Sequence, residues 1–358
     1  MRKSSLPSSA VGPAKSRKEQ LNNNTMENNQ FNGSLYPVMV ESQEGTVQMG
    51  EQRNPFILGN SIPLELPELQ DKYCTPVFSK DNVETISHAD FATTALEAVQ
   101  TFFHGQTVKA PVIRCSHEMK LRTRNGAGKL VENLTPEDES SYMQRMMFMI
   151  ELPGIQRVVN GNLLNLQVVG VRSYAETNLL GLSTQQQRFR LGIGFVNTVC
   201  TNLLLRTDGV NLSIKVTNLT DLYRYCLEVF SRYDHQRHLE DMERLGQTTI
   251  DVPLFARFLG RARMASQMPA AMKRELGLPE FLLPESQINS MVRDYYTDEN
   301  FAGNGQDITA WQFYQLMTNY RNNYIDVAME RCINSFQVAQ GIARAVNHED
   351  DTWSWFIS

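Results

Sequence analysis

The order of apolar and polar positions changes twice along this chain of 358 residues. Residues 1–53 are rich in Ser, Asn, Gln, Lys and Gly and show no apolar periodicity, so we expect a disordered basic and polar leader. Residues 54–217 contain short apolar runs of strand length and composition, which predict an α+β sheet subdomain. Residues 218–358 have helical periodicity and predict a mainly helical subdomain packed on it. The expected fold class is α+β, with a largely antiparallel sheet in the N-terminal half followed by a helical C-terminal half.

The sheet is predicted from its apolar runs and from the turn signals between them. Asn160-Gly161 predicts a hairpin, because Gly readily takes the positive φ that a tight turn needs. Asp208-Gly209 predicts a second hairpin in the same way. Two glycines in Gly192-Ile193-Gly194 indicate a bulge or close packing within a strand. The expected strands are Tyr73–Phe78, Tyr142–Leu152, Leu163–Val171, Arg188–Phe195, Leu203–Arg206 and Leu212–Val216.

The helices are predicted from one start signal and from their apolar faces. Ser87 followed by Asp90 marks a helix start just before an apolar stripe that begins at Phe91. Further helices follow from apolar residues at helical spacing, around Leu222–Tyr233, Phe255–Ala262, Pro284–Tyr296, Asp307–Tyr320 and Ile325–Ile342. The aromatic residues at the end of the chain are expected to pack against the body; they are Trp353, Trp355 and Phe356.

Composition narrows the class of protein. The chain carries 34 Lys+Arg against 39 Asp+Glu, a net charge of -5, and it is 41% hydrophobic. These values are typical of a globular protein and exclude collagen-like, disulfide-scaffold and wholly disordered chains. Residues 1–25 hold five basic residues against one acidic residue. We therefore expect either a tail for nucleic acid or, as we favour, a dispensable leader, with Met26 as an alternative start. No apolar run approaches the roughly 20 residues of a membrane-spanning helix, so we expect no membrane partner.

The cysteines indicate the compartment. There are five, an odd number, widely spaced and never in a CxxC pair, which predicts neither a disulfide framework nor a zinc ribbon. We therefore expect a reduced, cytoplasmic protein. We also expect no cofactor, because no cofactor-binding motif in the sequence is complete. Cys200 has the chemistry of a nucleophile if a histidine activates it, but its neighbours Val199 and Leu203 favour a buried structural thiol.

Two apparent catalytic or metal motifs do not hold. Gly126-Ala127-Gly128-Lys129 resembles the end of a phosphate-binding P-loop, but Thr123 replaces its first glycine and Leu130 replaces its Ser or Thr. A loop tip between strands explains it better. His235 and His238 have the spacing of helical metal ligands. The charged residues around them predict a solvated helix face instead, so we expect no metal.

Two basic groups are candidates for nucleic-acid contacts. Lys120, Arg122 and Arg124 alternate, so on a strand they share one face. Such local positive charge is what phosphate contacts need. The second group includes Arg257 and Arg261. Ordinary solvated strand edges are the competing interpretation, and the acidic body argues against strong nonspecific binding to nucleic acid.

Several segments between residue 54 and the end of the chain form a recognisable set. They are Pro76–Asn82 with Thr85–His88, Val158–Asn162, Gly194–Asn202, Thr207–Gly209, Asp298–Phe301 and Trp355–Ile357. Together they resemble an uncharacterised bacterial family that is designated only as a domain of unknown function. The resemblance covers residues from about 54 to 358 and implies no mechanism.

Three further features carry a more distant similarity. They are Val169–Tyr174 with Asn178, Cys200 with Asn202, and Trp311 with Tyr314. These features resemble phage/plasmid-like proteins of mobile elements. The resemblance implies an accessory role for the protein and no catalytic residues. The role of four motif positions stays open; they are Asn197, Cys200, Asn202 and Trp311.

Three functions compete at this level. The first is a non-enzymatic nucleic-acid-binding accessory protein that contacts phosphates through Lys120, Arg122 and Arg124, with Arg172 and Tyr174 adding a groove contact. The second is a protein-interaction module acting on a host or element factor, and the third is a metal-assisted enzyme. The sequence leaves the oligomeric state open.

Overall fold

The computed structural model describes residues 55–76, 85–179, 186–301, 303–320 and 322–358. The expected leader therefore lies outside the described residues. In chain order the elements are β1 (Ile62–Leu64), α2 (Leu66–Asp71), α3 (His88–Phe102), β2 (Val112–Cys115), β3 (Glu118–Arg122), η1 (Val131–Asn133), η2 (Pro136–Asp138), β4 (Glu139–Met143), β5 (Arg145–Val159), β6 (Asn162–Ser173), α4 (Tyr174–Leu179), β7 (Gln187–Asn197), β8 (Leu203–Val216), α5 (Leu219–Arg232), α6 (His235–Leu245), β9 (Thr249–Ile250), α7 (Val252–Gln267), α8 (Ala270–Glu275), α9 (Glu285–Thr297), β10 (Ile308–Thr309), α10 (Ala310–Thr318), η3 (Ile325–Val327), α11 (Ala328–Val346) and η4 (Asp351–Phe356).

A six-stranded antiparallel sheet in the order β1-β2-β5-β6-β7-β8 forms the centre of the fold. The helices follow it in the C-terminal half, which confirms the α+β class. The hairpin at Asn160-Gly161 is also confirmed: it joins β5 to β6, and its two residues have φ angles of 47° and 82°. Positive φ at both central residues matches the right-handed twist of the flanking strands.

Asp208-Gly209 is not a hairpin, and this prediction was wrong. β8 runs without interruption from Leu203 to Val216 and pairs with β7. A Cβ atom at Gly209 would lie 2.4 Å from the carbonyl oxygen of Ile193, so glycine here permits close packing of two strands. The register of β7 and β8 shifts between Gly192 and Gly194, which confirms the expected bulge. Of the expected strand Tyr73–Phe78, residues 73–76 are not in a strand and the last two lie outside the described residues.

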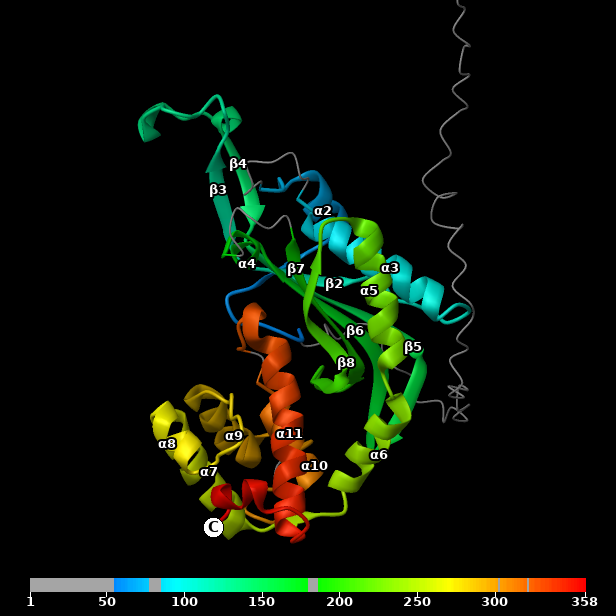
Figure 1. Cartoon of the computed structure of the whole chain (residues 1–358), viewed down its shortest axis with the longest axis vertical. Helices are drawn as coiled ribbons and strands as arrows, with labels where there is room; N and C mark the ends of the chain where they lie inside the picture. The colour runs from blue at the N-terminus through cyan, green and yellow to red at the C-terminus, as the bar shows by residue number, and fades with distance from the viewer. Residues whose placement is uncertain (1–54, 77–84, 180–185, 302, 321) are drawn as a thin grey trace, which may run out of the picture. The chain divides into compact units, whose positions relative to one another are not determined.

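Helices cover both faces of this sheet (Figure 1). On one face the ring of Phe91 in α3 lies 5.0 Å from that of Phe148 and 4.9 Å from that of Phe189. On the other, Met329 and Cys332 of α11 join a cluster with residues of β5, β6 and β8. Burial on both faces explains why these strands are apolar almost without alternation.

Capping residues and apolar faces position the helices much as expected. Ser87 caps α3 through a capping box with Asp90, and Asn218 caps α5. The predicted face of α5 is buried apart from Tyr225, which is exposed. Trp353 and Phe356 are buried, as predicted for the C-terminal aromatics. No helix among the described residues is long and apolar enough to cross a membrane. The division of the body at residues 217 and 218 stays a prediction.

A second, two-stranded sheet of β3 and β4 extends beyond the central sheet (Figure 1). Its antiparallel register places Lys120 opposite Ser141 and Arg122 opposite Glu139. Residues 123–138 connect the two strands at the far end. We call β3, β4 and this connection the arm.

Candidate functional site

The first predicted basic group lies on the arm. Lys120 and Arg122 are exposed on β3, and Arg124 follows in the turn after the strand. Lys120 Nζ contacts Glu139 Oε2 at 2.9 Å, and this hydrogen bond raises the pKa of Lys120. Arg122 donates to the carbonyl oxygen of Lys129 at 2.8 Å. Arg124 has no hydrogen bond or ion pair to another described residue, so it is the most available cation of the group.

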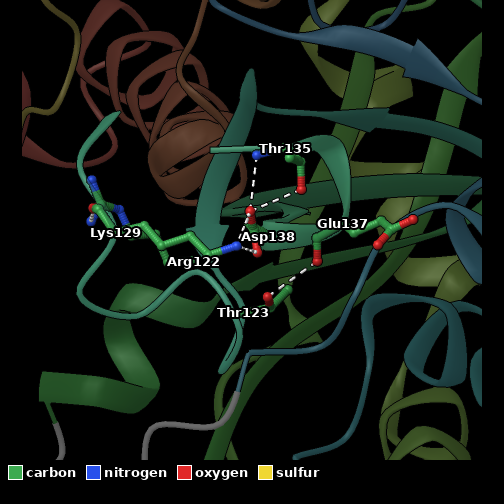
Figure 2. Close-up of polar contacts among 6 residues, drawn as sticks. All are labelled: Arg122, Thr123, Lys129, Thr135, Glu137 and Asp138. Carbon is green, nitrogen blue, oxygen red and sulfur yellow. Dashed lines mark hydrogen bonds and ion pairs between the residues drawn. The ribbon is translucent and has the colours of Figure 1, made fainter. Parts of the chain in front are cut away.

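Asp138 makes hydrogen bonds to two other residues of the connection between β3 and β4 (Figure 2). Its carboxylate accepts from Lys129 Nζ at 2.7 Å and from the backbone N–H and hydroxyl of Thr135 at 2.9 and 2.8 Å. The hydrogen bond from Lys129 is the main reason that the pKa of Asp138 falls to about 2. Thr123 donates to the carbonyl oxygen of Glu137 at 3.2 Å.

These contacts change the interpretation of the arm as a phosphate surface. Lys129 is bound to a carboxylate, so Gly126–Lys129 forms a turn between strands and not a phosphate cradle. Residues 117–143 contain five acidic residues against four basic ones. The arm is therefore not a surface of concentrated positive charge.

The expected groove contact by Arg172 and Tyr174 was wrong, because both side chains are buried, at 1% and 2% exposed. The guanidinium of Arg172 lies over the rings of Tyr174 and Phe189, at 4.7 and 4.4 Å from their centroids. It donates to Gln187 Oε1 at 2.7 Å and also to the carbonyl oxygen of Ile86. Burial lowers its pKa to about 10. A side chain in this position supports the core and cannot reach a nucleic acid.

The second basic group lies on the helical half, and its two named arginines have different surroundings. Arg257 is exposed on α7. Arg261 donates to the carbonyl oxygen of Ser358 at 3.3 Å, and its guanidinium lies 4.8 Å from the ring centroid of Trp355. Arg261 therefore contacts residues 355 and 358 from α7, whereas Arg257 makes no hydrogen bond or ion pair with another described residue.

His235 and His238 are not on a solvated face, and that prediction was wrong. They are 8% and 0% exposed. Tyr233 Oη lies 2.7 Å from His238 Nδ1, and the ring of His238 meets those of Phe195 and Phe336 edge-on, at 5.8 and 5.0 Å. Burial is the main reason that the pKa of His238 falls to about 3. Among the described residues no cluster of three or more His, Cys, Asp or Glu side chains is arranged to hold a metal ion.

Of the four motif positions of open role, Trp311 lies on α10, and Asn197, Cys200 and Asn202 lie at the β7–β8 turn, which α10 contacts. Gln315 Oε1 accepts from Asn197 Nδ2 at 3.4 Å and from Asn202 Nδ2 at 3.0 Å. Trp311 donates to Asn162 Oδ1 at 2.7 Å, and Cys200 is buried within the turn. All of these contacts are internal, so they stabilise the packing of α10 on the sheet.

A pocket of about 680 Å³ lies between β8, α6 and α11. Four arginines line it: Arg206 from β8, Arg237 and Arg244 from α6, and Arg344 from α11. Asp241 and Glu349 are the acidic residues of the lining, so arginines outnumber acidic residues there by four to two. Asp208 and Asp350, outside the lining, pair with Arg206 and Arg344. The lining also includes glutamine side chains and a small apolar patch; among these residues are Gln247, Gln337 and Gln340 with Leu245, Ile333 and Ala343.

The arginines of this pocket have unused donors. Their ion pairs are long. Arg206 lies 3.5 Å from the carboxylate of Asp208 and 3.6 Å from that of Asp241. Arg244 lies 3.7 Å from Asp241, and Arg344 lies 3.8 Å from Asp350. None of the four guanidinium groups donates a hydrogen bond to another described residue. Arg206 is the deepest, with a side chain 13% exposed and a buried Nη1 that has no hydrogen-bond partner. A guanidinium carries five N–H donors in a planar fork suited to carboxylate and phosphate oxygens.

Sequence reasoning missed this pocket. Arg237 and Arg244 are seven residues apart, two helical turns, and this spacing indicates a shared helix face. Nothing local connects them to Arg206 or Arg344, which lie far away in the chain. Only the packing of α6 and α11 against β8 brings the four together.

Fold and site together define an α+β protein with an arginine-lined pocket at the junction of its sheet and its helices. The profile of the family described as "Domain of unknown function, B. Theta Gene description (DUF3871)" matches residues 40–357, and the chain belongs to this family. The match confirms the expected family membership and begins at residue 40, before the predicted start. No curated protein and no solved structure matches the chain.

Proposed function

We propose that this protein is a non-enzymatic binding protein for a phosphate-bearing ligand of the nucleotide class, held in the arginine pocket. One observation carries the proposal: four guanidinium groups converge on one cavity and none of them donates a hydrogen bond within the described residues. Arg206 Nη1 is buried without a hydrogen-bond partner, and buried donors normally have acceptors. The other three arginines are exposed around it. Phosphate oxygens are the strong acceptors that a guanidinium fork fits.

The size and lining of the pocket support a nucleotide over a bare anion. The volume of about 680 Å³ lies within the range of small-molecule pockets, and it is larger than the volume of an inorganic phosphate ion. The glutamine amides offer donors and acceptors for a sugar or a base edge, and Leu245, Ile333 and Ala343 offer an apolar surface for the base. The end of a nucleic-acid strand presents the same chemistry, so the polymer and the free nucleotide are distinguished by experiment.

Isothermal titration with a nucleoside, its mono- and triphosphate, and 5′-phosphorylated single- and double-stranded oligonucleotides tests this proposal. We expect affinity to follow the number of phosphates and to fall with salt. Arg237→Gln and Arg344→Gln each remove a charge-assisted hydrogen bond, which is worth about 1.5–3 kcal/mol, so each should weaken binding about tenfold or more. Arg224→Gln is the matched control, because Arg224 is exposed on α5 outside the pocket.

Two outcomes would contradict the proposal that the pocket binds the phosphate-bearing ligand. Wild-type protein that binds none of these ligands would remove the proposed function. Binding that survives in Arg237→Gln and Arg344→Gln but is lost on charge reversal at Lys120, Arg122 and Arg124 would move the phosphate contacts to the arm.

We also propose that the protein is an accessory protein of a mobile element, acting in the cytoplasm. Support for the element is the similarity of Val169–Tyr174 and of Trp311 with Tyr314 to phage/plasmid-like proteins. Support for the compartment is the set of five free cysteines, four of them buried. Sequencing of the DNA on either side of the gene tests the first part: transfer or integration genes are expected, and a stable chromosomal neighbourhood in several strains would contradict it.

A further inference from the structure

The arm leaves one edge of β3 without a neighbouring strand among the described residues. The outer edge of β4, opposite β3, already has a backbone partner, because the N–H of Cys74 donates to the carbonyl oxygen of Ser141 at 2.9 Å. Thr123 N–H donates to the carbonyl oxygen of Asp138 at 2.8 Å. Backbone groups alternate in direction along an antiparallel ladder. Those of Glu118, Lys120 and Arg122 therefore point away from β4, toward the open edge.

The charges on this edge are complementary to themselves. β3 begins with Glu118, has Lys120 at its centre and ends with Arg122. If a second β3 strand lies antiparallel to the first and centred on Lys120, each Glu118 faces the Arg122 of the second copy. The same register places each Met119 beside a Leu121, and these apolar side chains are 44% and 37% exposed.

We propose that β3 pairs with β3 of a second copy of this chain, about a twofold axis at Lys120, and joins two arms into one four-stranded sheet. The outward backbone groups then form three hydrogen-bonded residue pairs, each exchanging two bonds, or about six hydrogen bonds. Opposite charges and apolar residues facing each other across strands both stabilise a sheet.

The central lysine does not oppose this pairing strongly. Each Lys120 is already paired with Glu139 of its own chain, at 2.9 Å. Charges that protect an edge from pairing work by repelling a second copy. Here the charges at the two ends of the strand have opposite signs, so an antiparallel copy is attracted. A nucleic acid suits the edge less well, because acidic residues outnumber basic ones on the arm.

Sedimentation velocity of the full chain over a range of concentrations tests the proposal, with charge swaps at the two ends of β3. Glu118→Arg and Arg122→Glu each place like charges opposite each other twice, so each should raise the dimer Kd about tenfold or more. The double variant E118R/R122E restores both attractions and should return to near the wild-type Kd. An equimolar mixture of the two single variants should form a heterodimer.

Glu132→Arg is the matched control, since Glu132 is exposed in the connection of the arm and should leave the Kd unchanged. Circular dichroism of each variant confirms that it is folded. A wild-type protein that is monomeric at every concentration would overturn the proposal. A dimer Kd that neither Glu118→Arg nor Arg122→Glu changes would overturn it as well. Oligonucleotide binding that is lost in Arg122→Glu, without any dimer in the wild type, would assign the edge to nucleic acid instead.

Discussion

At the scale of single residues, His238 shows how burial changes chemistry. It lies on α6 in a stretch of charged residues, yet its ring is fully buried. Burial disfavours the charged imidazole and lowers its pKa to about 3, and Arg206 adds to the effect. In the unfolded chain the group has its ordinary pKa of 6.5. The unfolded chain therefore binds more protons between these values, and stability is lost as the pH falls below 6.5.

We expect His238→Asn to remove this part of the pH dependence. His238 stays neutral in the folded protein, whereas it takes up a proton in the unfolded chain. With the two pKa values given above, this difference lowers the free energy of unfolding of the wild type by about 2 kcal/mol between about pH 7.5 and pH 5. Asn retains an acceptor for the hydroxyl of Tyr233 but does not titrate. Urea unfolding at both pH values measures the difference, and an equal loss of stability in both proteins would show that His238 is not the titrating group. His104→Asn, at an exposed histidine, is the control.

At the scale of elements, the contact between α10 and the β7–β8 turn depends on one amide. Gln315 Oε1 accepts from Asn197 and Asn202, and all three side chains are buried. A buried amide without a partner loses its hydration and gains nothing in return. The packing of α10 on the sheet therefore depends on satisfied polar groups as well as on apolar area.

Gln315→Leu should lower the free energy of unfolding by about 2–3 kcal/mol, because it leaves buried amide donors without this acceptor. The matched change Gln236→Leu, at an exposed position on α6, should cost less than about 0.5 kcal/mol. Chemical denaturation measures both. If the two variants lose similar amounts of stability, the amide contact at the β7–β8 turn contributes little.

Individual elements also show where local signals are ambiguous. Asn160-Gly161 and Asp208-Gly209 carry the same turn signal, but only the first is a turn. Gly161 needs its positive φ of 82°, whereas Gly209 needs only the absence of a Cβ atom beside Ile193 and Tyr233. Both requirements select glycine, so the dipeptide alone does not distinguish them.

At the scale of the whole molecule, one hydrophobic cluster joins the two predicted subdomains. Met147, Val169 and Leu205 of the sheet pack in the same cluster as Met329 and Cys332 of α11. Burial raises the pKa of the Cys332 thiol to about 12, as expected for a thiol within such a core. Neither the sheet nor α11 can bury its apolar surface without the other.

We therefore expect residues 54–217 and 218–358 to unfold together. Differential scanning calorimetry should show one transition, with calorimetric and van't Hoff enthalpies that agree. Met329→Ala, in the shared cluster, should lower that single transition as a whole, at a cost of about 2–5 kcal/mol. Two transitions, with only one of them moved by Met329→Ala, would instead support two independently stable subdomains.

The features that could be predicted from the sequence are those that local forces control. The change from strand-like runs to helical periodicity gives the α+β class, Ser87 begins a helix, and Asn160-Gly161 turns a hairpin. Each of these depends on backbone sterics and hydrogen bonds between residues a few positions apart, so the signal is present in a short window. Membership of the family was also predicted from the sequence, because a family match compares the residues themselves.

Packing in three dimensions determines which polar side chains are available for function, and the sequence did not predict it. Arg172 is buried because Gln187 and the carbonyl oxygen of Ile86 meet it there, and His238 is buried under Phe195 and Phe336. The pocket depends equally on distance in the chain, since its four arginines come from β8, α6 and α11. Solvation and charge pairing are properties of the surroundings in three dimensions, so residue type and spacing alone do not fix them.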